Sequence, residues 1–356
     1  MRSKIHSSFT GRELVERGPL MLTEDQALQA VGQLQSIGIG MDSALVGPAG
    51  GNLGTPAQFL QNWLPGVVRQ VTKIRNADAL MGVETVGSWE DEEVIQTASE
   101  LTGKAELYGD VANIPLANYN ATYERRSIIR FEQGVMMGAL EEARAAKANI
   151  SMGVEKRAAA ADSLDIIRNR VAFLGYNQPD TRVFGFLNDP NLPAYVNVAA
   201  GVAGLPWSGK TFEEITRDIR VAVTALIVQS GGNIRPQAVS MTLALPLGFE
   251  EYMGVTTTAN GYSVGEWLAT TYPRIRVETA PELTGANGGA NVMYLYAERV
   301  EDGSTDGGQV IAQIVPARFQ ALGTEKRAKG VVEDYTNALA GVMVKRPWAV
   351  VRYSGI

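Results

Sequence analysis

Residues 204–211, GLPWSGKT, satisfy the phosphate-binding pattern G-x-x-x-x-G-K-[ST]. The defining positions are Gly204, Gly209, Lys210 and Thr211. A phosphate cradle needs converging backbone N–H groups, but Pro206 lacks one and Trp207 places an indole where the loop must close tightly. The chain also shows no convincing second strand that ends in a magnesium-binding aspartate, which nucleotide hydrolysis requires. We therefore interpret the motif as a decoy, in which Lys210 binds no nucleotide and Thr211 caps a helix.

Residues 261–265, GYSVG, match the G-x-S-x-G nucleophile elbow of serine hydrolases. Such a hydrolase needs a histidine that follows the serine in the chain, and the single histidine, His6, precedes it. Ser263 also opens the sequence Ser-Val-Gly-Glu, which is a helix-capping box. We therefore interpret Ser263 as a helix cap without a catalytic role.

The composition excludes several further kinds of site. The 356-residue chain has no cysteine, so it forms no disulfide or zinc–thiolate site and supplies no thiol nucleophile. Its net charge of −6 argues against a surface that mainly grips nucleic acid. We interpret the acidic run at residues 89–93, WEDEE, as a solvated turn or a contact for a basic neighbour, because no metal-ligand pattern accompanies it. We expect no catalytic residue, no cofactor and no metal.

No stretch of about 18 apolar residues is present, and the first residues lack an apolar signal region. The sequence therefore predicts a soluble protein in a cytoplasm-like setting.

The strongest structural prediction is a long helix over residues 151–174. Leu164, Ile167, Val171 and Leu174 recur at helical spacing on one face, and Gly175 is suited to end the helix. A helix of this length spans roughly 36 Å. Its apolar stripe must therefore pack along a sheet or other helices.

The chain begins with an irregular, glycine-rich arm, and the region between this arm and the helix is predicted to be extended. We expect strands at residues 67–74, 80–89, 105–109 and 118–131. Between about residues 81 and 127, charged residues occur on both sides of the alternation, so we expect a two-stranded ribbon without a core of its own. A helix is expected over residues 135–148.

The region after residue 175 alternates between strands and helices. Strands are expected at 182–189, 194–200, 239–245, 274–280 and 291–298, and helices at 211–230, 249–253 and 263–272. Alternation over 206–298 predicts a compact α/β subdomain. Four later strands, at 310–315, 331–340, 341–345 and 348–353, are expected to lie on the long helix.

This order of parts resembles the Hong Kong 97-type major capsid proteins of tailed bacteriophages. Seven stretches resemble signatures of one phage capsid family: residues 85–93, 108–116, 123–134, 185–195, 280–298, 325–330 and 344–356. The resemblance implies an α+β capsid fold with four parts. They are an N-terminal arm (1–66), an extended β-ribbon loop (67–130), a peripheral domain (131–205 and 309–356, with spine helix 152–174) and an α/β axial domain (206–308).

The resemblance implies a structural, non-enzymatic function. It implies a subunit that self-assembles as hexamers and pentamers into the icosahedral head of a tailed double-stranded DNA phage. The shell would enclose DNA without sequence-specific binding, assemble in the host bacterial cytoplasm and have no membrane contact. Portal, scaffolding and decoration proteins are its expected partners. Some 65 residues before the first strand suggest a separate scaffolding protein and no cleavage of this subunit.

Two alternatives are an encapsulin-like bacterial nanocompartment shell, which shares the fold, and a P-loop nucleotide-binding enzyme. For a capsid subunit we expect the arm and ribbon to be ordered by neighbouring subunits. Phe59, Leu60 and Trp63 would anchor the arm, and Glu90 to Glu93 would face basic side chains of another copy. We also expect Leu164, Ile167 and Val171 to face the strands between residues 331 and 353, and Lys210→Ala to leave particle formation intact apart from any local packing role.

Overall fold

The computed structural model describes residues 75–108, 110, 114–147, 151–176, 178–257 and 261–356. The expected arm, its anchors Phe59, Leu60 and Trp63, and the expected strand at residues 67–74 lie outside these residues. Within the described part, no helix is both long enough and apolar enough to cross a membrane.

The long helix is confirmed as α5, Met152–Leu174. It ends at Gly175, whose N–H donates to the Val171 carbonyl at 2.8 Å and whose φ is +68°. A Cβ at this position would lie 2.5 Å from the Val183 carbonyl oxygen, so only glycine fits this end of the helix.

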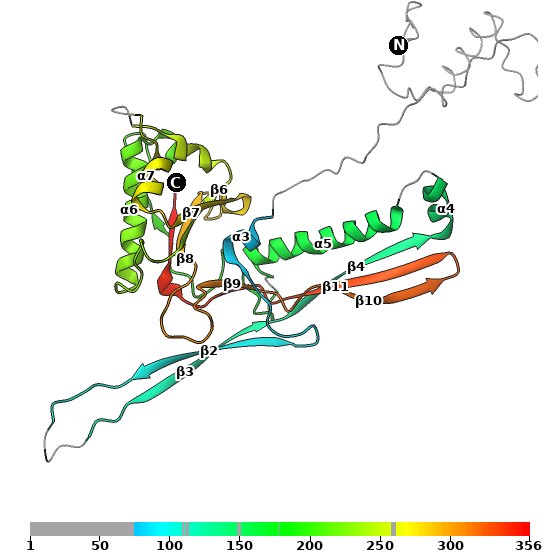
Figure 1. The fold of residues 1–356 in the computed structure, drawn as a ribbon, viewed down its shortest axis with the longest axis horizontal. Helices are drawn as coiled ribbons and strands as arrows, with labels where there is room; N and C mark the ends of the chain where they lie inside the picture. The colour runs from blue at the N-terminus through cyan, green and yellow to red at the C-terminus, as the bar shows by residue number, and fades with distance from the viewer. Residues whose placement is uncertain (1–74, 109, 111–113, 148–150, 177, 258–260) are drawn as a thin grey trace, which may run out of the picture. The chain divides into compact units, whose positions relative to one another are not determined.

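Helix α5 lies along a three-stranded antiparallel sheet of order β10-β11-β4 (Figure 1). Its strands are β4 (Ile129–Gly138), β10 (Ala317–Arg327) and β11 (Gly330–Leu339). Leu164 packs with Tyr335 of β11, and Val171 packs with Leu339 of the same strand. The prediction that this face of the helix meets the later strands is therefore confirmed. Leu174 is exposed, so the buried stripe ends at Val171.

One expectation in this region is wrong, and one strand was not predicted. Residues 135–138 do not begin a helix, because they finish β4, and helix α4 covers only Ala139–Lys147. All ten residues of β4 pair with β11, so the ladder of hydrogen bonds outweighs the helical spacing of the apolar residues. Strand β10 was not predicted, because nearly every residue in it is exposed and no alternation marks it.

The predicted ribbon exists, but only one of its strands was placed correctly. It consists of β2 (Glu93–Thr102) and β3 (Asn118–Ser127), paired antiparallel over their full length. The expected strand at 80–89 is wrong, because helix α3 (Ala77–Met81) and the short strand β1 (Val83–Glu84) take its place. Residues 105–108 form no strand. Ala77, Leu80 and Met81 are buried at helical spacing, which explains why this segment coils.

The second large sheet has five strands in the order β5-β13-β8-β6-β7. They are β5 (Val196–Asn197), β6 (Met241–Pro246), β7 (Ile275–Ala280), β8 (Val292–Ala297) and β13 (Val350–Ser354). Helices α6 (Phe212–Gln229) and α7 (Val264–Thr271) pack with this sheet in one large core, as the α/β prediction requires.

Strand β13 corrects the expectation that all four late strands lie on the long helix. It pairs antiparallel with β8 and parallel with β5, and it packs against α6. Strands β9 (Ile311–Ile314) and β12 (Val342–Val344) pair with each other, and β1 joins them. The expected strand at 182–189 is reduced to a single bridge between Val183 and Tyr176.

Candidate assembly surfaces

The residues of the P-loop pattern form a short 3-10 helix, Trp207–Gly209, followed by helix α6. The Lys210 side chain is fully buried, and its Nζ lies 2.6 Å from Asp218 Oδ2 and 2.9 Å from the Ala199 carbonyl oxygen. The Trp207 indole donates to the same carboxylate oxygen at 3.1 Å. The ammonium group therefore holds the loop onto α6. This contact is a local packing role of the kind that the prediction for Lys210→Ala set apart, because the substitution would leave the Asp218 carboxylate buried without its cation.

Thr211 and Ser263 are both helix caps, as predicted. The Thr211 N–H donates to Glu214 Oε2 at 3.0 Å in the capping box that opens α6. Backbone N–H groups of Thr211 and Val202 lower the pKa of Glu214 by stabilising its charged form. In the second box, Ser263 Oγ accepts from the Glu266 N–H at 3.2 Å and opens α7.

The acidic run at residues 89–93 forms an exposed turn that leads into β2, and two of its charges have partners within the chain. Glu92 lies 3.5 Å from Arg130, and Glu93 lies 3.8 Å from Arg125. Arg130 also donates to the Trp89 carbonyl at 2.7 Å. These contacts support the interpretation as a solvated turn. Across the described ranges, no group of three acidic, histidine or cysteine side chains could hold a metal ion.

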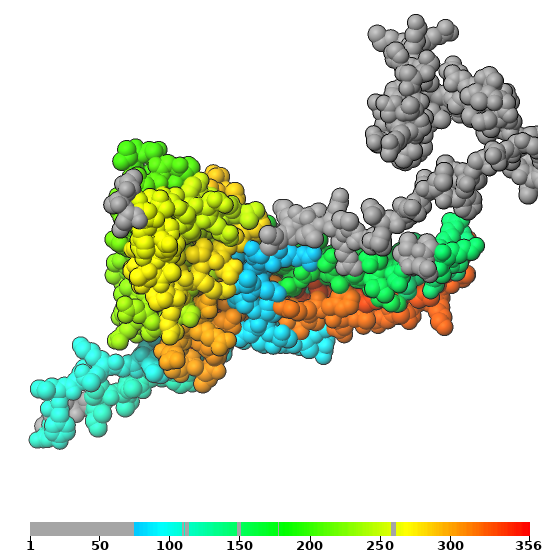
Figure 2. Space-filling model, turned by 45° about the horizontal axis from the view of Figure 1, so that its top comes forward, coloured from blue at the N-terminus to red at the C-terminus, as the bar shows by residue number. Residues whose placement is uncertain are grey.

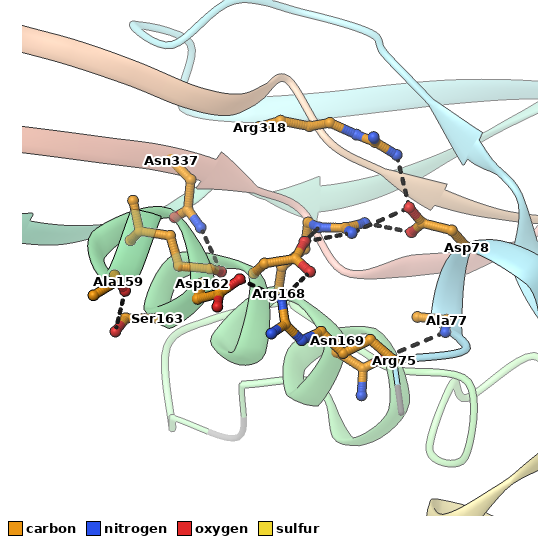
Figure 3. Close-up of polar contacts among 12 residues, drawn as sticks. Arg75, Ala77, Asp78, Ala159, Asp162, Ser163, Arg168, Asn169, Arg318 and Asn337 are labelled. Carbon is orange, nitrogen blue, oxygen red and sulfur yellow. Dashed lines mark hydrogen bonds and ion pairs between the residues drawn. The ribbon is translucent and has the colours of Figure 1, made fainter. Parts of the chain in front are cut away.

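A chain of alternating charges fixes α3 to the spine helix α5 (Figure 3). Arg168, almost fully buried on α5, binds Asp78 of α3 and Asp165 one turn earlier on its own helix. Arg318 of β10 reaches the same Asp78 at 2.8 Å, and Arg75 reaches Asp165 at 2.7 Å. Burial alone would raise the pKa of Asp165, but hydrogen bonds from Arg75 and Arg168 hold it below its usual range.

The same short helix also contacts the five-stranded sheet. Asn169 of α5 accepts from the Ala77 N–H at 3.2 Å, while Tyr296 of β8 donates to the Leu80 carbonyl. Arg276 of β7 donates to the Ala79 carbonyl. Helix α3 is therefore hydrogen-bonded to the spine helix on one side and to strands β7 and β8 on the other.

The ribbon is held at its root by one buried arginine. Arg126 of β3 is fully buried, and its Nη2 lies 2.8 Å from Asp189, whose side chain is also fully buried. The guanidinium lies over the Phe184 ring, 5.0 Å from its centroid. Burial raises the pKa of Asp189, and the charge of Arg126 opposes that shift. Val94 and Ile128 complete the root by packing with Met343.

Beyond this root the ribbon exposes large apolar side chains. In the space-filling view the ribbon (cyan) projects beyond the neighbouring parts of the described chain (Figure 2). Exposed residues occur on both strands and in the segments between them: Ile95, Leu101, Leu107, Tyr108, Ile114, Leu116, Tyr119 and Tyr123. Exposed apolar side chains gathered on one element are typical of an interaction site.

Comparison with known proteins shows the family to which the chain belongs. The family model of the Pa193 gp26 major capsid protein matches residues 48–355. The chain belongs to the Pa193 gp26 major capsid protein family.

This chain is therefore a tailed-phage major capsid protein and a component of the virion capsid. The match favours this function over a nanocompartment shell or a nucleotide-binding enzyme, because the family is one of structural proteins. No curated protein sequence matches the chain.

Solved capsid structures share the fold of this major capsid protein at low sequence identity. The capsid of the myovirus phage XM1 aligns with a TM-score of 0.68 at 13% identity, covering 86% of this chain and 100% of that one. The capsid of the native GTA particle aligns with a TM-score of 0.55 at 11% identity, covering 88% and 99%. The structure from Gordonia phage Cozz aligns with a TM-score of 0.51 at 12% identity, covering 87% of this chain and 98% of that one. The mixed helix-and-sheet fold is thus that of phage capsid proteins.

The sequence reasoning missed the buried charges of this capsid protein. Asp218 falls between Ile215, Ile219 and Ala222 on the buried face of α6, and Arg168 lies next to Ile167 and Val171 on α5. A charged residue inside an apolar stripe requires a partner, since an unpaired charge is costly to bury. The helical spacing of the sequence therefore already indicated that Asp218 and Arg168 lie within apolar stripes and need partners. The partners themselves, Lys210 and Asp78, come from other segments and could not be assigned without the fold.

Proposed function

We propose that this capsid protein self-assembles as hexamers and pentamers into the icosahedral head shell of a tailed phage. In this proposal the shell encloses packaged double-stranded DNA without sequence-specific contacts. The observation that carries the proposal is the family match over residues 48–355. The exposed apolar ribbon supports it, because a ribbon without a core gains apolar contacts when another subunit covers it.

We further propose that the fold is of the Hong Kong 97 type. The arm would be residues 1–66, the extended loop 67–130, the peripheral domain 131–205 with 309–356, and the axial domain 206–308. Strand β13 is better counted with the axial domain, because it pairs with β8 there. Helix α3 also lies within the residues assigned to the extended loop, yet its hydrogen bonds attach it to α5, β7 and β8.

The charge of the protein fits a container from which DNA must leave. A net charge of −6 gives little attraction for phosphate, so packaged DNA would be held weakly at the wall. Portal, scaffolding and decoration proteins are proposed as partners, and the host bacterial cytoplasm as the place of assembly.

Expression of the chain together with its candidate scaffolding protein tests the proposal, with electron microscopy of the purified product. We expect closed icosahedral shells of uniform size. Nuclease-protected DNA in heads from infected cells is the second expected result. Small shells filled with a cargo enzyme would favour the nanocompartment alternative, and a product without any shell would refute the proposal.

A further inference from the structure

A cavity of about 720 Å³ lies at the C-terminal end of helix α5. This end of the helix lies beside α3 (Figure 1), where Asn169 accepts from the Ala77 N–H at 3.2 Å. Three parts of the chain line the cavity: the last turns of α5, the segment that follows this helix and the turn after β7. Its volume is that of a small-molecule site, because such sites typically measure about 300–1,000 Å³.

Aliphatic side chains make up much of the cavity lining. Ile167, Val171 and Leu174 follow one another at helical spacing on α5. Leu187 and Ala286 add to this surface from the other two segments. Leu174, which continues the stripe of α5 beyond its buried part, is 44% exposed. A ligand with an apolar stem would therefore be favoured here, because its contact with these side chains removes apolar surface from water.

The same cavity contains a carboxylate whose hydrogen bonding is incomplete. Glu282 lines the cavity from the 3-10 turn η4 (Pro281–Leu283), which follows β7. Its Oε1 accepts from Asn169 Nδ2 at 3.0 Å. Its Oε2 is buried, and no donor of the described chain lies within hydrogen-bonding distance of it. A buried acceptor without a donor is costly, so a ligand that donates to Oε2 would gain binding energy.

The Glu282 carboxylate is held in place by an amide that is itself fixed. Asn169 is buried on α5, and its Oδ1 accepts from the Ala77 N–H while its Nδ2 donates to Glu282 (Figure 3 shows the contact with Ala77). Both ends of the amide are therefore used. A ligand would meet a carboxylate whose position is set by α3 and α5, and such precisely placed polar groups are typical of small-molecule sites.

Arg170 brings one positive charge to the cavity lining. This side chain is exposed and forms no ion pair with any described carboxylate, Glu282 included. A ligand with several ammonium groups would bring one of them close to Arg170, and like charges in one site are unfavourable. The lining therefore favours a ligand with a single ammonium group.

We propose that the cavity binds an alkylammonium group, whose N–H donors reach Glu282 Oε2 and whose stem lies on the aliphatic lining. An ammonium carries three donors and no acceptor, which suits an oxygen that lacks a donor. Its hydrogen bond to a carboxylate is charge-assisted, and alkyl stems of this kind bury along apolar surface. A metal ion fits less well, because Glu282 supplies the one carboxylate among the described lining residues. The site is contained within one subunit and does not depend on assembly of the shell.

Calorimetric titration of the full-length subunit with n-hexylamine tests the site, and 1-hexanol is the neutral ligand with the same stem. At about pH 7 the amine is protonated. We expect saturable binding of hexylamine, at least about tenfold tighter than that of hexanol, because only the ammonium forms a charge-assisted hydrogen bond with Glu282. A second ammonium, in 1,6-diaminohexane, should weaken binding, and Arg170→Gln should remove this difference between the two amines.

Substitutions in the lining show whether the amine binds at this cavity. Glu282→Gln keeps the length of the side chain and should weaken hexylamine binding at least about tenfold, while hexanol binding stays unchanged. Glu251→Gln is the matched control, because Glu251 is exposed in the 3-10 turn η3 (Phe249–Gly254) outside the lining, and it should change neither affinity. Ala286→Leu adds a larger side chain to the lining and should weaken both ligands, which keeps the site testable if Glu282→Gln does not fold.

A free aliphatic amine and a lysine side chain of another polypeptide share this chemistry. Carbodiimide treatment of particles distinguishes the two sources, because it joins a carboxylate to a lysine amine only where the two are in contact. A crosslinked peptide pair that contains Glu282 and a lysine would assign the site to a lysine side chain. Particles that give no such pair but still bind hexylamine would assign it to a free amine. Either result supports an alkylammonium site.

The contrary outcomes separate this site from the proposed shell. Equal affinities for hexylamine and hexanol, or an unchanged hexylamine affinity in Glu282→Gln, would overturn the inference and leave the shell function standing. A wild-type chain that forms no particles would overturn the shell function, while the amine titration of the subunit would be unaffected.

Discussion

The five-stranded sheet and the ribbon differ in how their strands are stabilised. Every residue of β6 and β8 is buried, and both strands belong to one large core with α6 and α7. In the ribbon, β2 buries only Val94 and β3 only Arg126. The first kind of strand is stable within one subunit. The second keeps its pairing but leaves its apolar side chains exposed, so under the proposed self-assembly folding and assembly would depend on different residues.

The largest expected effect is at the buried charge pair of Lys210 and Asp218, which joins the loop before α6 to that helix. Lys210→Ala leaves the Asp218 carboxylate buried without its cation, and loss of one partner of such a pair typically costs about 3–5 kcal/mol. Denaturant unfolding of the subunit measures this cost. Arg217→Ala, at an exposed position of the same helix, is the control and should change stability by less than about 0.5 kcal/mol.

This prediction also bears on the P-loop pattern. Since the Lys210 ammonium already binds Asp218, ATP should not raise the unfolding temperature of the wild-type protein. An unaltered free energy of unfolding in Lys210→Ala would contradict the structural role. Saturable ATP binding by the wild type would contradict the decoy interpretation.

The next effect compares the same substitution in the spine helix and in the ribbon. Leu164→Ala removes a buried side chain that packs with Tyr335, and such truncations cost about 2–5 kcal/mol. Ile167→Ala should cost less, because Ile167 is only partly buried. Leu101→Ala should leave subunit unfolding unchanged within about 0.5 kcal/mol yet lower the yield of particles. An equal loss of unfolding free energy in Leu164→Ala and Leu101→Ala would contradict the distinction between residues for folding and residues for assembly.

The smallest effect concerns acid stability. Arg346, nearly buried, hydrogen-bonds Asp302 and Asp306. It holds the pKa of Asp302 well below its usual range and lowers that of Asp306 to about 2. Carboxylates with a lowered pKa stabilise the folded state above their unfolded pKa, near 4. That contribution is lost as the pH falls from about 4 towards about 2.

Arg346→Met should therefore lower stability at pH 7 by about 1–3 kcal/mol and flatten the decline between pH 4 and pH 2. Urea unfolding over this pH range measures both. Arg125→Met, which removes an exposed ribbon partner of Glu93, is the control and should leave the curve unchanged. Parallel curves for the wild type and Arg346→Met would show that Arg346 does not set this pH dependence.

Local signals in the sequence located the elements whose stability is largely their own. Helix α5 has apolar residues at helical spacing and is followed by Gly175, a residue type that commonly ends helices. Helices α6 and α7 open with capping boxes. Their buried faces followed from spacing alone. The seven signature stretches then indicated the capsid family, which the match over residues 48–355 confirms.

The errors concern segments whose conformation depends on distant partners. Residues 135–138 are extended because they pair with one edge of β11. Strand β10 is extended because it pairs with the opposite edge of β11. Neither segment carries an alternation of buried and exposed residues that would reveal this. The shared face of Ile95, Leu101, Tyr119 and Tyr123 was also out of reach, because these residues share a face only once the register of β2 with β3 is known.

The position of β13 determines when the five-stranded sheet can be completed during synthesis of the chain. This strand lies between β5 and β8 and is the last of the five to leave the ribosome. Until residues 350–354 emerge, the sheet has a gap at its second position, and the side chains of Val350 and Tyr353 are missing from the core. A translation product interrupted a few residues early lacks a complete sheet. Loss of these residues therefore leaves β5 and β8 without the strand that joins them.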